Sequence, residues 1–210
     1  MARRYDAEAT RGRILKAAEH EFSRYGFDGA RVDRIATRSK ANKGMIYIYF
    51  GNKKALYKTV FLENYRKVTE QEELLQLTPA DLPKLTQRIL ACYFSFHERN
   101  PHWWRFMAWE NLEPASGISP EEIHSMSGRV MEHLHGIYHE GQKRGAFRKD
   151  VSFSSYIFNV MAASFFYRSN MATMSGTLLE NLANAGYRET LIHELATMID
   201  SGIQIPRDRP

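Results

Sequence analysis

Apolar residues recur at the spacing of an α-helix through most of this 210-residue chain, and this periodicity limits the folds open to it. Residues three and four apart lie on one face of a helix. The first such segment, residues 7–25, carries Ile14, Leu15, Ala18, Phe22 and Tyr25 at these spacings. No segment alternates at period two, and we find no glycine-rich phosphate loop and no internal repeat. The sequence therefore predicts an all-α protein of nine or ten helices.

Caps, prolines and glycines divide the chain into these helices. Asn42 can cap a short helix over residues 43–50 through its side-chain oxygen. Pro101 is expected at the first position of another, and Ser119-Pro120 with Glu122 has the form of a capping box. The remaining helices are predicted over residues 7–25, 32–39, 53–77, 79–99, from 120 to the stop at 143–145, 152–170 and 187–201.

Positive charge is concentrated at the N-terminal end of the chain. Residues 1–60 carry 14 lysines and arginines against 6 acidic residues, while residues 61–210 carry 15 against 18. A basic module joined to a mildly acidic one is typical of a chain that binds phosphates at one end. On charge alone, an acidic partner or a membrane surface is the alternative.

Composition narrows the class of protein further. Cys92 is the single cysteine, which excludes an intramolecular disulfide and leaves too few thiolates for a cysteine zinc site. The first six residues run into charge with no apolar signal segment, and the longest apolar stretch, near residues 160–167, is too short to span a membrane. We expect a cytoplasmic protein with no membrane segment and no cofactor.

Three short helices, the second and third joined by a short turn, precede a long fourth helix, and this order predicts a helix-turn-helix. Residues 26–36 read Gly-Phe-Asp-Gly-Ala-Arg-Val-Asp-Arg-Ile-Ala, residues 42–50 read Asn-Lys-Gly-Met-Ile-Tyr-Ile-Tyr-Phe, and residues 52–56 read Asn-Lys-Lys-Ala-Leu. Together they resemble the signature of the TetR family of bacterial transcriptional regulators. The resemblance implies a DNA-binding domain over residues 1–52 and a helical effector-binding and dimerisation domain over residues 53–210.

The resemblance also implies which residues contact DNA. A short helix in the major groove presents its first side chains to base edges, and flanking residues contact phosphates. The predicted base-facing residues are Lys43, Gly44, Met45 and Ile48, and the predicted phosphate contacts are Arg31, Tyr47, Tyr49 and Lys53. Ile46 and Phe50 should face the protein interior. Arg31 stands where the family usually has a capping Ser or Thr, so the cap of residues 32–39 falls to Asp28 or to no side chain.

The C-terminal domain is expected to bind a small apolar or aromatic effector, because ligand sites are mainly apolar with a few polar groups. The candidate ligand-binding residues are Tyr93, His97, Trp103, Phe106, Met107, Glu110, Met131, Tyr138, Phe165 and Arg168. For the aromatic cluster near residues 103–109, plain core or dimer packing is the alternative to a cavity wall. The expected partners are double-stranded operator DNA, the effector and a second copy of the chain.

Other functions are weaker interpretations of the sequence. His135 and His139 have a spacing that can bind zinc, but no clear third ligand accompanies them, and we expect no metal site. No nucleophile elbow or paired-carboxylate motif organises a catalytic site, so an enzyme is not expected. A helix-turn-helix protein without a small-molecule effector remains the alternative function. Dimerisation is predicted through the last two long helices, by Ile157, Met161 and Phe165 on one and Leu191, Leu195 and Met198 on the other.

Overall fold

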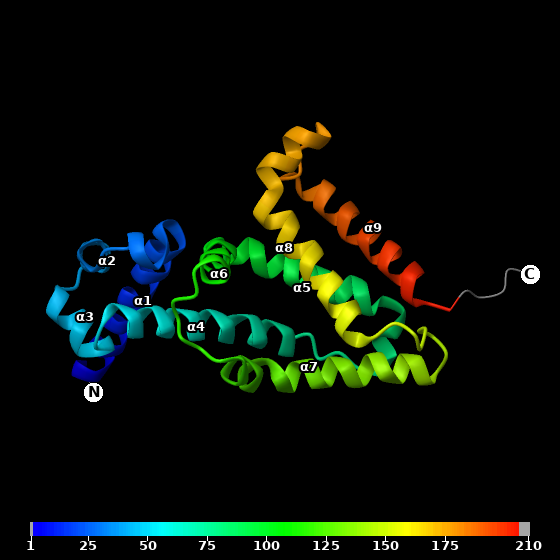
Figure 1. Ribbon diagram of the computed structural model, residues 1–210, viewed down its shortest axis with the longest axis horizontal. Helices are drawn as coiled ribbons and strands as arrows, with labels where there is room; N and C mark the ends of the chain where they lie inside the picture. Colours follow the sequence, from blue (N-terminus) through cyan, green and yellow to red (C-terminus); the bar gives the residue numbers. More distant parts are fainter. Residues whose placement is uncertain (1, 206–210) are drawn as a thin grey trace, which may run out of the picture. The chain divides into compact units, whose positions relative to one another are not determined.

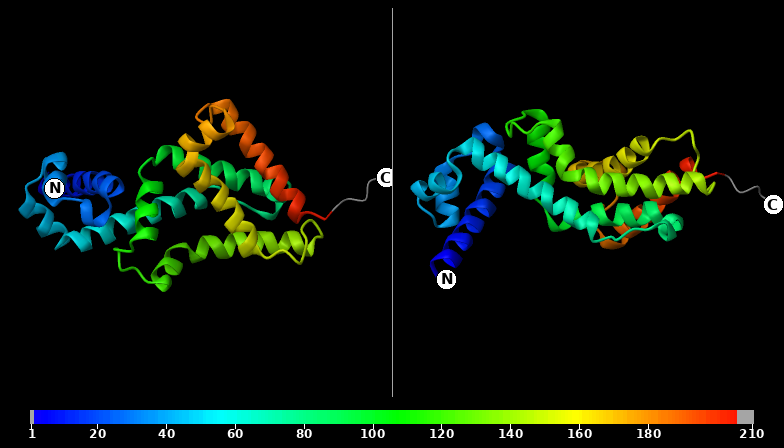
Figure 2. Two further views of the ribbon diagram at one scale, coloured as in Figure 1. Left: turned by 45° about the horizontal axis from the view of Figure 1, so that its top comes forward. Right: turned by 90° about the horizontal axis from the view of Figure 1, so that it is seen from below.

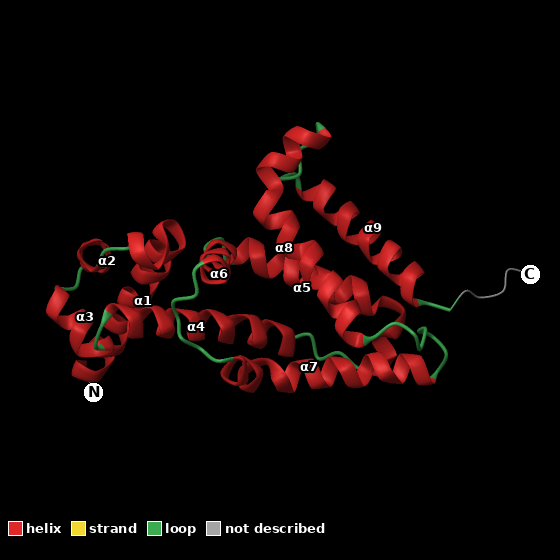
Figure 3. Ribbon diagram, in the orientation of Figure 1, coloured by secondary structure: helices red, strands yellow, loops and turns green. Residues whose placement is uncertain are grey.

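The computed structural model describes residues 2–205, with side chains from residue 7 onward, and confirms the predicted all-α fold (Figures 1 and 3). Its helices are α1 (Ala2–Gly29), α2 (Val32–Ser39), α3 (Lys43–Phe50), α4 (Lys53–Glu73), the 3-10 helix η1 (Pro79–Lys84), α5 (Leu85–Arg99), α6 (Trp103–Leu112), α7 (Pro120–Lys143), α8 (Phe153–Leu178) and α9 (Ala185–Ile203). Over the described range, β-pairing is limited to one bridge between Phe147 and Gln204. Within the same range, every helix is too short or too polar to cross a membrane.

The described chain divides into two compact units. Unit 1 comprises the described part of Met1–Val68 together with Asn100–His124, and unit 2 comprises Thr69–Arg99 with the described part of Ser125–Pro210. Unit 1 extends past the boundary predicted between residues 52 and 53, because α6 packs on α1 and ion pairs join α4 to α1. Each unit has its own buried core.

Aromatic rings from α1, α4 and α6 form the centre of unit 1. The ring centroid of Tyr57 lies 4.9 Å from that of Phe22 and 4.8 Å from that of Phe106. Tyr57, Phe22 and Phe106 are fully buried, so each contributes its whole ring area to the core. Helix α6 is therefore an integral part of unit 1.

Helix α5 carries the core of unit 2 and packs against both α8 and α9, which are joined near residue 180 (Figure 2). A stack of three buried rings extends this core. The ring centroid of Tyr138 lies 4.9 Å from that of Tyr156 and 5.1 Å from that of Phe147. The Tyr138 hydroxyl donates to the backbone oxygen of Val151, at 3.1 Å, so its one polar atom is satisfied.

Most predicted helix bounds lie within a few residues of the observed ones, and the capping box of Ser119 and Glu122 is confirmed. The helix predicted over residues 79–99 is wrong in its first part, which forms η1 because Pro83 lies inside it and cannot donate a helical hydrogen bond. Pro101 lies in a turn, and α6 begins two residues later, at Trp103. Helix α8 continues to Leu178, eight residues beyond its predicted end, and then stops at a left-handed residue, Leu179.

The predicted helix stop at Gly26 is a kink within α1. Gly26 has φ 65° and ψ −173°, a conformation open mainly to glycine, and one further helical turn follows it to Gly29. The indole of Trp109 lies against this glycine, so that an added Cβ would come within 2.9 Å of its ring. Both the backbone and the packing therefore require glycine here.

We expect Gly26→Ala to lower the free energy of unfolding by at least about 1 kcal/mol, because alanine is strained at this φ and its Cβ would displace Trp109. Gly12→Ala is the matched control in the same helix, since no atom lies within 4 Å of its added Cβ. It should raise the stability by about 0.5–1 kcal/mol. Urea denaturation of both variants measures the difference, and equal effects would contradict the role assigned to Gly26.

Candidate DNA-binding site

Helix α3 is held to unit 1 by one face and leaves the opposite face open. Ile46 and Phe50 are buried, as predicted, and the side chain of Asn42 caps the helix by accepting from the backbone N–H of Met45, at 2.7 Å. Ile48 is 83% exposed and Tyr47 is 41% exposed. Of the other predicted contacts on this helix, Lys43 and Gly44 are exposed and Met45 and Tyr49 are half-buried. The open face thus presents a cation, two phenol rings and apolar groups at the end of a short helix, which suits a DNA groove.

A buried carboxylate takes the place of the missing cap at the start of α2. The Arg31 side chain makes no capping hydrogen bond, and its backbone N–H donates to Glu21 Oε1, at 3.0 Å. The same oxygen accepts from Arg34 Nε, at 2.6 Å. A carboxylate at a helix N-terminus is favoured by the unpaired N–H groups and by the helix dipole. The side chain of Arg31 remains exposed, where it can meet a phosphate.

Glu21 positions the start of α2, and the sequence did not indicate this role. It lies among the apolar positions of α1, and only the fold brings it to a residue ten positions later. Of the two predicted alternatives for the cap, Asp28 and no side chain, the structure has the second, because no side-chain capping hydrogen bond is made at the start of α2. Glu21 instead binds the backbone N–H of Arg31 from the preceding helix.

Lys43, the predicted donor to base edges, is paired with an acid of α2. Its Nζ lies 3.0 Å from Asp33 Oδ1, and both side chains are largely exposed. The hydrogen bond to Asp33 raises the pKa of Lys43, so the lysine stays protonated. An exposed ion pair contributes little stability. Lys43 can therefore exchange Asp33 for DNA, but Asp33 also brings a negative charge to the open face.

Lys53 begins α4 and lies across an aromatic ring. Its Nζ is 4.6 Å from the ring centroid of Phe27 and donates to the backbone oxygen of Asp28, at 3.4 Å. Partial burial lowers the pKa of Lys53. The ring and the carbonyl together restrain this ammonium at the beginning of the helix, which is a useful property for a phosphate contact.

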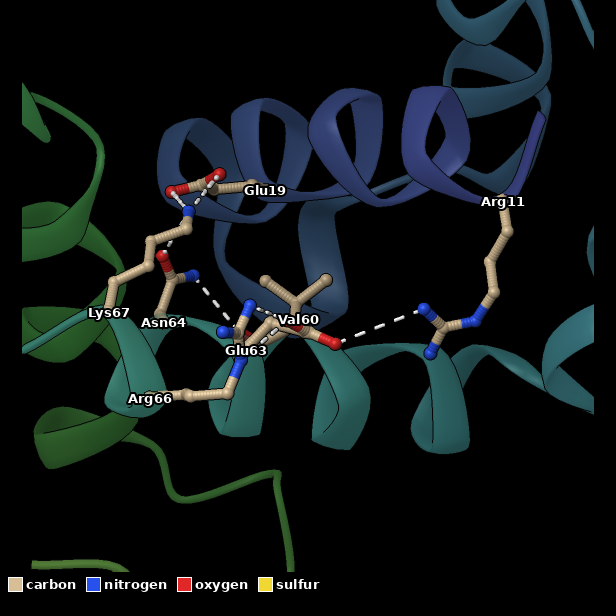
Figure 4. Close-up of polar contacts among 7 residues, drawn as sticks. All are labelled: Arg11, Glu19, Val60, Glu63, Asn64, Arg66 and Lys67. Carbon is tan, nitrogen blue, oxygen red and sulfur yellow. Dashed lines mark hydrogen bonds and ion pairs between the residues drawn. The ribbon is translucent and has the colours of Figure 1, made fainter. Parts of the chain in front are cut away.

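Two sets of polar contacts connect α4 to α1 within unit 1 (Figure 4). Lys67 Nζ lies 3.2 Å from Glu19 Oε2 and donates to the side-chain oxygen of the buried Asn64, at 3.1 Å. Glu63 pairs with Arg11 across the helices, at 3.9 Å, and with Arg66 on its own helix, at 3.0 Å. These contacts position the helix that begins at Lys53 against the helix that supports α2.

The ten predicted ligand-binding residues are divided between the two units. Trp103, Phe106, Met107 and Glu110 belong to unit 1. Trp103 and Phe106 are buried beside the rings of α4, which favours the core-packing alternative for these two residues. Glu110 accepts from the backbone N–H groups of Ala115 and Ser116, at 3.1 and 3.2 Å, and so closes the loop after α6.

The other six ligand-binding candidates belong to unit 2, and the fold brings three of them together. His97 and Arg168 line one hollow, and the ring centroid of Phe165 lies 6.1 Å from that of His97. Tyr93 is buried and donates to Glu72 Oε1, at 2.5 Å. Burial raises the pKa of the Glu72 carboxyl to about 7. Tyr138 lies in the stack of rings described above, and Met131 packs beside the core.

Comparison with known proteins identifies both parts of the chain. Residues 14–60 match the family model described as bacterial regulatory proteins, tetR family, and residues 84–199 match the tetracyclin repressor-like C-terminal domain. The chain is 33% identical to the HTH-type transcriptional repressor NicS of Pseudomonas putida, over 87% of this chain and 86% of that protein. It is also 33% identical to the HTH-type transcriptional repressor SCO4008 of Streptomyces coelicolor, over 75% of this chain and 77% of that protein.

The same fold occurs among solved structures. A TetR family transcription regulator from Marinobacter aquaeolei aligns with a TM-score of 0.75, over 98% of this chain and all of that chain, at 18% sequence identity.

Removing the acid that pairs with Lys43 should strengthen DNA binding. We expect Asp33→Asn to raise affinity for duplex DNA several-fold and to steepen its salt dependence by up to about one unit of logarithmic slope per subunit, because Lys43 then contacts a phosphate instead. Glu113→Gln, which removes the same charge from an exposed position after α6, is the matched control. Fluorescence anisotropy at several salt concentrations measures both. An unchanged or weaker affinity of Asp33→Asn would show that Asp33 does not compete with DNA.

Proposed function

Because this chain belongs to the TetR family of bacterial transcriptional regulators, we propose that it represses transcription by binding a palindromic operator as a homodimer and releases the operator when a small ligand binds. The observation that carries the DNA-binding part is the open face of α3, where Lys43, Tyr47 and Ile48 are exposed while Ile46 and Phe50 hold the helix in place. Both NicS and SCO4008 are transcriptional repressors, which supports repression over activation.

Exposed apolar side chains on α8 and α9 support the homodimer. Phe158 is 71% exposed, Phe166 54% and Met198 70%, and such a concentration on two long helices is typical of a surface that a partner covers. Two such helix pairs would form a four-helix bundle around a two-fold axis. Ile157 does not belong to this face, because it is buried in the core of unit 2.

The release by a small ligand rests on the family and on the hollow in unit 2 that His97 and Arg168 line. A ligand changes operator affinity only if it binds one conformation of the protein more tightly than the other. A hundredfold release needs a coupling free energy of about 2.7 kcal/mol, which is within the usual range for allosteric proteins. A regulator without a small-molecule effector is the second candidate, and it would bind operator DNA unchanged in a broad ligand screen.

The relatives are transcriptional regulators, and nothing in the sequence organises a nucleophile, a carboxylate pair or a phosphate loop for catalysis. We therefore assign the protein a regulatory role in the cytoplasm and no enzymatic reaction.

Selection from random duplex DNA tests the main proposal, and we expect an inverted repeat whose half-sites are one helical turn, about 34–36 Å, apart.

On the selected site, Lys53→Ala should weaken binding and reduce the slope of the salt dependence by about one per subunit, because one phosphate contact is lost. Tyr47→Ala should weaken binding with an unchanged slope, because the phenol is neutral. Recovery of no palindrome, or full affinity in both variants, would contradict the assignment of α3 as the reading helix.

Placing a negative charge on the exposed apolar face of α8 and α9 tests the proposed dimer surface. Phe158→Glu and Met198→Glu should each shift the protein toward monomers in sedimentation velocity and lower its operator affinity, because a buried carboxylate without a partner is costly. His193→Glu adds the same charge to an exposed position of α9, about 140° from Met198 around the helix axis, and should leave the dimer intact. A wild-type protein that is monomeric at micromolar concentration would overturn the model.

A further inference from the structure

A hollow of about 150 Å³ in unit 2 is lined by residues of α5, by residues of α8 and by the beginning of α9. Two of its lining residues, Phe94 and Tyr167, are aromatic, and their ring centroids lie 4.8 Å apart. His97 and Arg168 also line the hollow, and Arg188 and Glu98 complete its charged part.

The two arginines of this hollow differ in their partners. Arg188 Nη1 donates to Glu98 Oε2, so its charge is compensated within the wall. Arg168 has no hydrogen-bond or ion-pair partner among the residues that the structure describes, and its Nε is buried. An arginine whose guanidinium is partly withdrawn from water without an anion is unfavourable, so a missing partner is expected.

His97 adds hydrogen-bonding capacity without adding charge. It is 5% exposed, and burial together with the Arg168 guanidinium lowers its pKa to about 4, so the imidazole is neutral at pH 7. Its Nδ1 has no partner in the described part of the chain. A neutral imidazole offers one donor and one acceptor. The hollow therefore has one uncompensated positive charge, from Arg168.

We propose that this hollow binds a small, flat organic monocarboxylate, with the carboxylate on the Arg168 guanidinium and the flat body against Phe94 and Tyr167. This inference rests on the proposed function, because it names the chemical class of its effector. A guanidinium holds a carboxylate through two parallel hydrogen bonds. Because Arg188 and Glu98 compensate each other, the one remaining positive charge matches a singly charged carboxylate and not a doubly charged phosphate. The hollow is smaller than the roughly 300–1,000 Å³ of sites for drug-sized ligands, which excludes a large ligand.

Titration calorimetry of the full chain at pH 7.5 with benzoate and with its neutral analogue benzamide tests the charge requirement. We expect benzoate to bind at least about tenfold more tightly, because only the carboxylate pairs with Arg168. Benzamide binding as tightly as benzoate would overturn the proposal. So would the absence of benzoate binding to the wild type up to about 10 mM.

Substitutions of Arg168 test the position of the site. Arg168→Gln should weaken benzoate binding at least about tenfold, whereas Arg168→Lys, which keeps the charge but not the paired donors, should weaken it less. Arg144→Gln removes an exposed guanidinium, just after the end of α7, that pairs with Glu140, and it should leave benzoate binding unchanged. Without ligand, Arg168→Gln should melt no lower than the wild type, because the lost cation has no partner. If that variant does not fold, Arg168→Lys decides, and wild-type affinity in a folded variant would overturn the proposal.

Operator binding separates this inference from the proposed function. Benzoate that binds through Arg168 and weakens operator binding supports both. Benzoate that binds through Arg168 without changing operator affinity leaves the carboxylate site standing and removes its role as the effector site. A protein that binds no operator at all contradicts the proposed function, while calorimetry still decides whether the hollow takes a carboxylate.

Discussion

The buried carboxylate of Glu21 determines where the second helix of the helix-turn-helix begins. Burying a carboxylate is costly unless it is paired and hydrogen-bonded, and Glu21 meets both conditions through the Arg34 guanidinium and the Arg31 backbone N–H. The ion pair ties α2 to α1, and the short turn after α2 then brings Asn42 to the start of α3. Helix α3 then buries Ile46 and Phe50 and leaves Tyr47 and Ile48 exposed.

Buried aromatic rings connect α1, α4 and α6 within unit 1. Tyr57 of α4 contacts rings from both α1 and α6, and Trp109 of α6 lies against the glycine kink of α1. Protein interiors are close-packed, and their elements tend to have a few discrete arrangements instead of a continuous range. A displacement of α6 within unit 1 would therefore have to involve α1 and α4 as well, and these are the helices from which α2 and Lys53 are supported.

Helix bounds that depend on neighbouring residues, such as caps, glycines and apolar spacing, could be predicted from the sequence. The bounds of α2 and α3 follow from the Asn42 cap, the neighbouring glycines and the apolar spacing, and the structure has them as predicted. Features that depend on contacts between different helices could not be predicted from the sequence. The role of Glu21 depends on a contact ten residues away, and the Lys43 pair depends on how two helices cross. Periodicity could not assign Trp103 and Phe106 to unit 1, because apolar spacing shows that a face is buried but not what covers it.

The ion pair between Lys43 and Asp33 changes the physical source of the DNA affinity. Much of the free energy of protein–DNA binding comes from the release of small cations that neutralise the phosphates. A lysine that already holds a carboxylate must give up that intramolecular counterion before it takes the place of those cations, so it contributes less of this entropic gain on any sequence. Under the proposed function, in which α3 is the reading helix, Lys43 therefore adds little general attraction to DNA. A guanine edge can accept hydrogen bonds from Lys43 and so replaces the contact with Asp33 more effectively than a phosphate of any sequence does. Asp33 therefore lowers the general affinity for DNA at this position and raises the discrimination between base pairs.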